Sequence, residues 1–313
     1  MYTYGPVPSR RLGSSLGVSP IPPKTCSYTC VYCQLGRTTR LQIKRESFFP
    51  KEEILSEIIR RSENTTTPID YVTFVGDGEP ILCKDLGWLI TQTKDKLKLP
   101  VAVITNGSLL FQEDVRHDLI NADVVLPTLD AGNEKTYRAV NRPHRSLNFD
   151  LLQKGLIKFR KEYHGQLWLE VMLVEGLNDT EEELQSIKKS IDLIKPNRVY
   201  IVTPIRPPAE SWVKPPKLET IINAQYILGT AQTITNREQG SFGINEFKNS
   251  KEAILEIGSR HPLRYEQAIE IEKEFSDVGT VDVMLKDKEL VLVQYNSEDY
   301  ILPSRFIRDK KKK

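Results

Sequence analysis

Alternating apolar strands and amphipathic helices over the first 216 residues predict an α/β fold with a parallel sheet covered by helices. Runs such as Val101-Ala-Val-Ile-Thr105 and Arg198-Val-Tyr-Ile-Val202 are typical of buried strands, and apolar stripes at helical spacing lie between such runs. We count about six strand–helix units, whereas a complete barrel needs eight. The sequence therefore predicts a partial (β/α)6 TIM-like barrel.

Each element has a local reason in the sequence. The helix at 50–61 begins at a proline, carries Glu52 and Glu53 in its first turn and ends with two arginines, which suits the helix dipole. The helix at 180–194 starts with Thr180 and Glu183 at capping-box spacing. We expect strands at 16–18, 69–75, 101–105, 123–127, 166–174 and 198–202, and helices at 50–61, 86–97, 111–120, 148–162 and 180–194.

The chain changes character after the predicted barrel. Five prolines make 203–216 stiff, and this segment either closes over a site, with Arg206 reaching in, or is a plain linker. A β-hairpin pattern at 278–285 and 289–295, preceded by helices at 251–258 and 263–275, predicts a winged-helix-like α+β module. We expect a barrel domain at 1–216, a connecting helix (218–235) and linker within 217–249, the module at 250–305 and a basic tail at 306–313.

Composition excludes several classes of protein. The 313 residues are 39% hydrophobic and 27% charged, as in a globular protein, and the net charge of +2 neither demands nor excludes nucleic acid. No apolar run approaches the length that spans a membrane, and the N-terminus lacks the apolar stretch of a signal peptide. Four cysteines are too few for a disulfide framework in a chain of this length, so we expect the reducing cytoplasm.

Three of the four cysteines lie in one short stretch. Cys26, Cys30 and Cys33 have C-x₃-C-x₂-C spacing, and Tyr32 precedes the last of them. A zinc site normally takes a fourth ligand, and the nearest candidates, Cys83 and His117, lie far along the chain. Thiolates also select iron–sulfur clusters, and a four-iron cubane held by three cysteines keeps one iron open.

This motif resembles the signature of the radical S-adenosylmethionine (radical SAM) superfamily. The resemblance implies that the three thiolates hold a [4Fe–4S] cluster and that S-adenosylmethionine (SAM) binds its open iron. It implies reductive cleavage of SAM to a 5′-deoxyadenosyl radical, which abstracts hydrogen from a substrate. It also implies an external electron donor such as ferredoxin or flavodoxin.

Polar residues follow the ends of the predicted strands, where parallel α/β folds bind ligands. The segment Gly76-Asp77-Gly78-Glu79-Pro80 resembles the Gly-Gly-Glu segment that binds the amino group of SAM in this superfamily. The resemblance extends to the strand-ending Asn106, to Thr128-Leu-Asp130-Ala and to the loop 175–179. The candidate cofactor-binding residues are Tyr32, Gly76, Asp77, Gly78, Glu79, Asn106, Asp130, Glu170 and Asn178.

Residues 4–216 resemble an iron–sulfur oxidoreductase branch related to tRNA wyosine-base synthases, although this chain has no cysteine before Cys26. A tRNA-modifying enzyme is therefore one alternative, and a winged-helix redox or metal-sensing regulator is another. Nucleobase, peptide and small metabolite all stay open as substrates. Four residues have two possible roles each. Arg10 and Arg11 either reach an anionic group or are solvated. Cys83 is either a buried apolar residue or a reactive thiol, and His144 either lies on the surface or acts on the substrate.

Overall fold

The computed structural model describes residues 1–229, 231–233, 242–244 and 247–304. Its strands are β1 (Thr3–Ser9), β2 (Gly13–Val18), β3 (Thr25–Cys26), β4 (Arg40–Leu41), β5 (Tyr71–Phe74), β6 (Val101–Thr105), β7 (Val124–Pro127), β8 (Gln166–Met172), β9 (Arg198–Val202), β10 (Gln232–Thr233), β11 (Leu263–Arg264), β12 (Leu290–Tyr295) and β13 (Glu298–Pro303). Its helices are α1 (Lys51–Asn64), α2 (Leu86–Leu97), α3 (Glu113–Leu119), α4 (Glu134–Val140), α5 (Phe149–Glu162), α6 (Glu181–Ile194), α7 (Leu218–Leu228), α8 (Ser250–Gly258), α9 (Tyr265–Glu274) and α10 (Thr280–Lys286), with a 3₁₀ turn, η1, at Pro80–Leu82.

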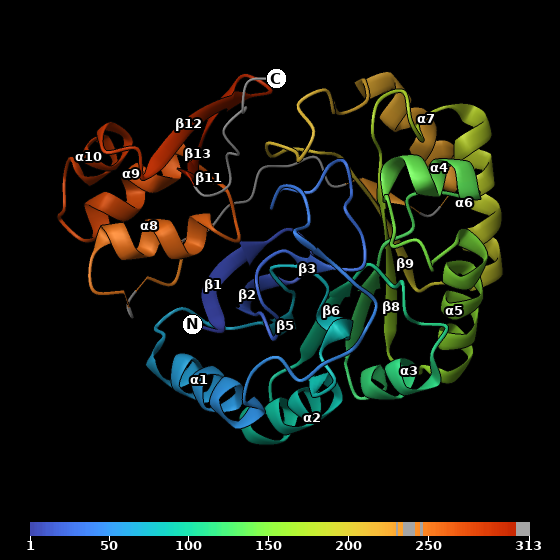
Figure 1. Ribbon diagram of the computed structural model, residues 1–313, viewed down its shortest axis with the longest axis horizontal. Coiled ribbons are helices and arrows are strands. Elements are labelled where there is room, and N and C mark those ends of the chain that lie inside the picture. The colour runs from blue at the N-terminus through green and yellow to red at the C-terminus, as the bar shows by residue number, and fades with distance from the viewer. Residues whose placement is uncertain (230, 234–241, 245–246, 305–313) are drawn as a thin grey trace.

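One large sheet organises the first two thirds of the chain. Its strand order is β1-β2-β5-β6-β7-β8-β9-β10, and all neighbours from β2 to β10 pair in parallel. Helices α1, α2, α3, α5, α6 and α7 form an outer layer around the curved sheet (Figure 1). Among the described residues, β2, β5, β6, β7, β8 and β9 are each followed by such a helix. The predicted partial barrel of six strand–helix units is therefore confirmed.

Three elements of the barrel were not expected from the sequence: strand β1, helix α4 and strand β10. The helix expected at 218–235 ends at Leu228, and residues 232–233 form β10 instead. Strand β1 contains two prolines and a glycine, yet it pairs antiparallel with β2 at the edge of the sheet, where prolines are tolerated. The seven-residue helix α4 begins at Asn133, whose side chain accepts a hydrogen bond from the backbone N–H of Thr136. Such short elements carry too few residues to show a clear period in the sequence.

The core fills both faces of the sheet. The main cluster packs the outer helices against the strands, with fully buried residues such as Ile58, Leu89 and Leu156. A smaller cluster fills the inner side of the barrel and includes Leu126 and Trp168. The apolar stripes of these helices face the sheet, and the loops that follow the parallel strands lie at one rim.

A compact C-terminal module follows the barrel. It contains α8, β11, α9, α10 and the hairpin β12–β13, and its sheet has the order β11-β13-β12. The strand expected at 278–285 is wrong, because this stretch forms helix α10 and the hairpin lies one strand later. Val281 and Met284 are buried three residues apart while Val283 is 57% exposed, so the stretch follows the helical period and not the alternation of a strand.

The module spans the open side of the partial barrel. Tyr4 and Val7 of β1 pack into the module's own apolar core. The hydroxyl groups of Tyr295 and Tyr300 donate hydrogen bonds to the backbone oxygens of Pro204 and Ile205, just after β9. The module thus contacts both β1 and the segment after β9, and in Figure 1 it lies in orange and red beside the blue N-terminal strands.

The sheet of the barrel continues past the boundary expected at residue 216. Helix α7 packs beside α6, and β10 pairs in parallel with β9 at Gln232. The division into 1–216, 217–249 and 250–305 stays a proposal, and α7 and β10 pack with the barrel although they lie beyond residue 216. The expected basic tail at 306–313 lies outside the described residues. Among the helices that the structure describes, none combines the length and the apolar character needed to cross a membrane.

Candidate functional site

The three closely spaced cysteines lie on a loop at the rim where the parallel strands end. Cys26 ends β3, and all three are half-buried free thiols. The backbone N–H of Tyr28 lies 3.4 Å from Sγ of Cys26, and Nδ2 of Asn141 lies 3.7 Å from Sγ of Cys30. Burial raises the pKa of each thiol. Within the described residues, no three His, Cys, Asp or Glu side chains converge closely enough to ligate a single metal ion.

The loop of Gly76 to Pro80 packs directly against the start of the cysteine loop. The backbone N–H of Glu79 donates to the carbonyl oxygen of Thr25 at 3.0 Å, and that of Lys24 donates to the oxygen of Asp77 at 2.5 Å. A Cβ atom at Gly78 would lie 1.8 Å from the Thr25 oxygen. Glycine at position 78 is therefore required by the close approach of two backbones.

The carboxyl group of Glu79 is buried beneath this contact. It accepts hydrogen bonds from the hydroxyl of Thr105 at 2.5 Å and from the backbone N–H of Asn106 at 2.7 Å. Burial raises the pKa of Glu79 to about 7, against the opposing effect of these donors. Nδ2 of Asn106 in turn donates to Oγ of Ser27 at 2.8 Å and lies 3.7 Å from Sγ of Cys26. Glu79 and Asn106 thus connect the end of β6 to the first cysteine.

Asp130 connects the middle of the cysteine loop to the sheet. Its carboxylate accepts from the hydroxyl of Tyr32 at 2.5 Å, from Nδ2 of Asn141 at 2.7 Å and from the backbone N–H of Met172 at 2.8 Å. Burial raises the pKa of Asp130 to about 6. Asn178 supports the same junction, since its Nδ2 donates to the backbone oxygens of Asp130 and Met172. These polar atoms bind the protein itself, so Asp130 and Asn178 act here as positioning residues.

A central cavity of about 330 Å³ lies beside the cysteine loop, inside the partial barrel. Tyr32 and Cys33 line it together with Gly76, from the loop after β5, and Glu170, from strand β8. The volume lies in the range of small-molecule sites. Glu170 forms an ion pair with Arg11 at 2.7 Å, and both side chains are largely buried. Arg10 and Arg206 also line the cavity, and contact of either side chain with a bound ligand stays a prediction.

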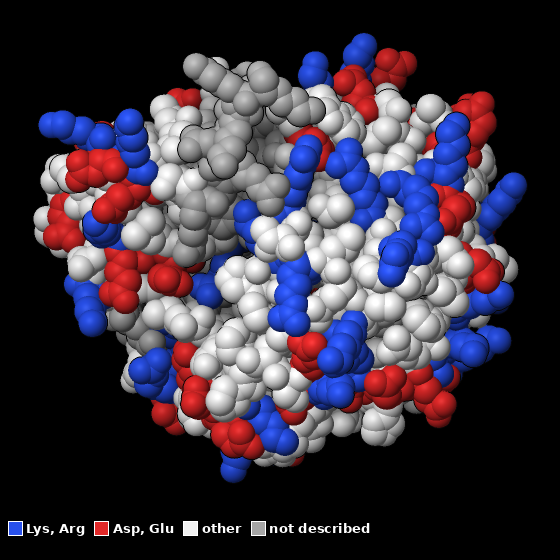
Figure 2. Space-filling model, in the orientation of Figure 1, with Lys and Arg blue, Asp and Glu red and all other residues white. Residues whose placement is uncertain are grey.

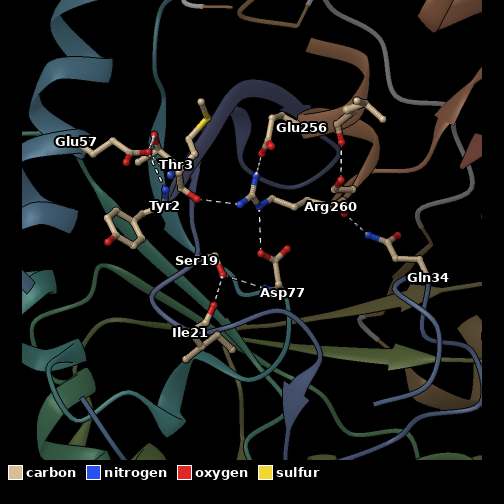
Figure 3. A network of polar contacts seen from close by, with 12 residues as sticks. Tyr2, Thr3, Ser19, Ile21, Gln34, Glu57, Asp77, Glu256 and Arg260 are labelled. Atoms are coloured by element: carbon tan, nitrogen blue, oxygen red, sulfur yellow. Dashed lines mark hydrogen bonds and ion pairs between the residues drawn. The ribbon is translucent and has the colours of Figure 1, made fainter. Parts of the chain in front are cut away.

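Arg260 connects the C-terminal module to this site (Figure 3). Its guanidinium forms an ion pair with Asp77 at 3.2 Å and another with Glu256 at 3.0 Å, and it donates to the backbone oxygen of Met1 at 3.0 Å. Its own backbone oxygen accepts from Nε2 of Gln34 at 3.1 Å. One module residue therefore contacts the loop after β5, the cysteine loop and the chain start.

Most of the predicted site residues come together, and the structure adds others. Asn141 and Arg260 had no assigned role in the sequence, although Asn141 opens the segment Asn-Arg-Pro-His144. In that segment His144 holds the loop through its backbone, because its N–H donates to the oxygen of Ser27 at 2.8 Å. Cys83 is 1% exposed within the main core, which supports its reading as a buried apolar residue.

Comparison with known proteins agrees with this geometry. A model of the radical SAM superfamily matches residues 21–187, which hold the cysteine loop and the four central strands of the sheet, β5 to β8. The chain belongs to the radical SAM superfamily. It is 39% identical over 316 residues to a UPF0026 protein of Methanocaldococcus jannaschii, with 98% of this chain and 97% of that protein covered.

Two solved structures share the fold. A radical SAM methyltransferase from Sphaerobacter thermophilus matches with a TM-score of 0.54 at 17% identity, over 70% of this chain and 66% of that one. Streptococcus suis SuiB bound to S-adenosylmethionine matches with a TM-score of 0.51 at 15% identity, over 71% of this chain and 49% of that one. At these identities the likeness concerns the fold alone.

Radical SAM proteins are enzymes that use a [4Fe–4S] cluster and SAM. The donor set found in this radical SAM chain fits those cofactors. Three free thiols lie on one loop, and N–H groups of Tyr28, Asn106 and Asn141 point at two of the sulfur atoms. Hydrogen bonds to sulfur are among the features that tune the potential of protein-bound clusters.

Proposed function

We propose that this chain is a radical SAM enzyme that binds its cluster through Cys26, Cys30 and Cys33 and acts on a substrate in the central cavity. One observation carries the proposal: Cys33 and Tyr32 of the cysteine loop line the same cavity as Gly76 and Glu170. When bound, the cluster supplies the electron for reductive cleavage of SAM to a 5′-deoxyadenosyl radical, which then abstracts hydrogen from the substrate. An external donor such as ferredoxin or flavodoxin would supply that electron.

The residues of the chain divide into two groups under this proposal. Gly76 and Asp77 lie on the loop that resembles the SAM-binding Gly-Gly-Glu segment, and Glu79 holds that loop against Thr105 and Asn106. Tyr32, Asp130, Asn141 and Asn178 fix the cysteine loop relative to β7 and β8. Direct contact of SAM with Gly78, Glu79 or Asn106 stays a prediction from the resemblance. The protein's part is to position the cofactors and exclude water around them.

Anaerobic reconstitution tests the proposal. The protein is loaded with iron and sulfide, reduced with dithionite and incubated with SAM, and 5′-deoxyadenosine is measured. We expect 5′-deoxyadenosine from the wild type and none from Cys30→Ala, with Cys83→Ala as the matched control that keeps its cluster. A protein that holds an intact cluster but forms no 5′-deoxyadenosine would refute the proposal.

The alternatives from the sequence are less well supported. A redox or metal-sensing regulator would use its C-terminal module apart from the cofactor site, whereas Arg260 of this module contacts Asp77 at that site. A tRNA substrate stays a prediction from the resemblance. The free thiols support the expected reducing, cytoplasmic compartment.

A further inference from the structure

The proline-rich segment of residues 203–216 packs against the cysteine loop. Nη1 of Arg206 donates to Oε1 of Gln34 at 2.8 Å, and the backbone N–H of Glu210 donates to the backbone oxygen of Val31 at 3.1 Å. Val31 follows the second cysteine of the loop, and Gln34 follows the third. The segment is therefore bound to the cysteine loop on both sides of the third cysteine.

An apolar cluster joins the same segment to the loop after β8. Val213 is 1% exposed and packs with Val31 and Val174, which are both fully buried. The backbone N–H of Glu175 donates to the backbone oxygen of Lys214 at 3.0 Å. Segment 203–216 thus connects two loops that the resemblance assigns to the cofactors, the cysteine loop and the loop after β8.

Glu210 forms ion pairs with two arginines at the centre of this segment. Its Oε2 accepts from Nη2 of Arg37 at 2.8 Å, and its Oε1 accepts from Nε of Arg37 at 2.9 Å and from Nη1 of Arg142 at 2.6 Å. Such a two-point contact fixes direction as well as distance. The side chain of Glu210 is 8% exposed, and the hydrogen bonds from Arg37 hold the pKa of its carboxyl group below the ordinary value.

The carboxylate of Glu210 lies between two like charges. Strand β3, which ends at the first cysteine, lies at the centre of the view in Figure 1, and Figure 2 shows Lys and Arg side chains gathered over that part of the same face. Because Arg37 and Arg142 both bind Oε1 of Glu210, their guanidinium groups lie close together. Like charges repel each other, so loss of the carboxylate would push apart the two segments that carry these arginines.

Arg142 connects the ion pairs to the second cysteine. It follows Asn141, whose Nδ2 lies 3.7 Å from Sγ of Cys30, and its backbone oxygen accepts from the N–H of Thr29 at 3.2 Å. Its φ of 45° lies in the left-handed region, which a residue other than glycine keeps only where surrounding contacts fix it. The ion pair with Glu210 is one of these contacts.

We propose that Glu210 is a positioning residue that holds the cysteine loop in place for cluster binding. It acts through Arg37 at the end of that loop, through Arg142 beside the second cysteine and through the backbone of Val31 between the second and third cysteines. The assignment rests on the function proposed above, because that function gives the three cysteines to the cluster.

Alkylation of the iron-free protein by N-ethylmaleimide tests the assignment without the cluster, and peptide mass spectrometry measures the rate at each cysteine. In Glu210→Gln we expect Cys30 and Cys33 to react about 10-fold faster than in the wild type. This value is the lower end for loss of a charge-assisted hydrogen bond, because the Arg37 side chain is 56% exposed. Cys83, buried in the main core, should react at its wild-type rate.

Iron release from the cluster-loaded protein provides a second measurement. The chelator bathophenanthroline should remove iron about 10- to 100-fold faster from Glu210→Gln than from the wild type, the usual range for loss of a group that supports metal ligands. Glu210→Asp keeps the charge and should release iron at an intermediate rate, and Arg37→Gln should behave like Glu210→Gln. Asp150→Asn, which breaks the exposed ion pair with Lys154 on α5, is the matched control and should match the wild type.

Each outcome decides for or against the assignment. Faster alkylation of the second and third cysteines in Glu210→Gln, with Cys83 and the Asp150→Asn control unchanged and partial recovery in Glu210→Asp, supports it. Wild-type rates of either alkylation or iron release in Glu210→Gln overturn it, as does an equal rise at Cys83, which indicates general loss of the fold. Should Glu210→Gln not fold, Arg37→Gln decides by the same criteria. A wild type that binds no cluster or forms no 5′-deoxyadenosine would remove the proposed function, while the alkylation rates would still decide the assignment.

Discussion

Replacing Gly78 by alanine would place a methyl group 1.8 Å from the carbonyl oxygen and 2.7 Å from the carbonyl carbon of Thr25. Ordinary van der Waals contact begins near 3.4 Å, so the oxygen contact falls about 1.6 Å short. Both neighbours are backbone atoms, which cannot move aside as the end of a flexible side chain can. We expect the upper end of the usual cost of overpacking, about 3 kcal/mol, and a melting temperature lower by about 6 °C.

The structural consequence should be local, because Thr25 immediately precedes Cys26. Moving the Thr25 carbonyl shifts the first cysteine and breaks the 3.0 Å hydrogen bond from the N–H of Glu79. We therefore expect Gly78→Ala to retain less iron per chain after anaerobic reconstitution, and to bind SAM more weakly in calorimetry. Iron content and the visible absorbance of the reduced and oxidised cluster provide the assay.

The matched control is Gly258→Ala in helix α8. A Cβ atom there meets its nearest neighbour, Pro303, at 3.7 Å, which is ordinary contact. Because Gly258 is the last residue of the helix, alanine there should stabilise the protein by at most about 0.5–1 kcal/mol, the value for a helix interior, and should leave iron content unchanged. If Gly78→Ala loaded iron and melted like the wild type, the close approach of the two loops would not be what requires glycine at position 78.

Three further changes probe the polar groups around the cysteine loop. Burial raises the pKa of Glu79 from 4.5 to about 7, so the folded state binds the proton more tightly. The contribution of Glu79 to the free energy of unfolding should therefore fall by roughly 3 kcal/mol as pH rises from 4.5 through 7. Denaturant titrations should show a loss smaller by that amount in Glu79→Gln than in the wild type, since Asp130, with its pKa raised to about 6, still contributes in both. Asn141→Ala removes donors to Sγ of Cys30 and to Asp130, so 5′-deoxyadenosine formation should drop about 10- to 100-fold. Redox titration should also show a shifted reduction potential of the cluster. An unchanged potential would count against the contact between the Asn141 N–H and the Cys30 sulfur. Tyr32→Phe removes the hydroxyl donor to Asp130 and should cost about 1.5–3 kcal/mol of stability, measured by urea unfolding against the exposed control Tyr226→Phe.

The barrel could be predicted closely because its elements are long and locally consistent. Helix α2 and strands β6 and β9 have the bounds expected from their apolar periods, and Thr180 caps α6 as its spacing indicates. Strand β1 was missed because its prolines and glycine oppose strand formation until a sheet edge accepts them. Helix α10 was misread because a short apolar run fits both periods, and burial of Val281 and Met284 decides between them.

The sequence by itself determined that three cysteines lie within eight positions and that polar residues follow the parallel strands, because both follow from local order along the chain. That the three thiolates hold a cluster stays a prediction. Only the tertiary structure decided which of these residues face the central cavity. The polar atoms of Asp130 and Asn178 form hydrogen bonds within the protein. Arg206 and His261, in contrast, are 55 residues apart in the sequence and contact each other in the cavity wall. The physical reason is that such contacts depend on how the C-terminal module packs against the open side of the barrel, and no local pattern encodes that packing.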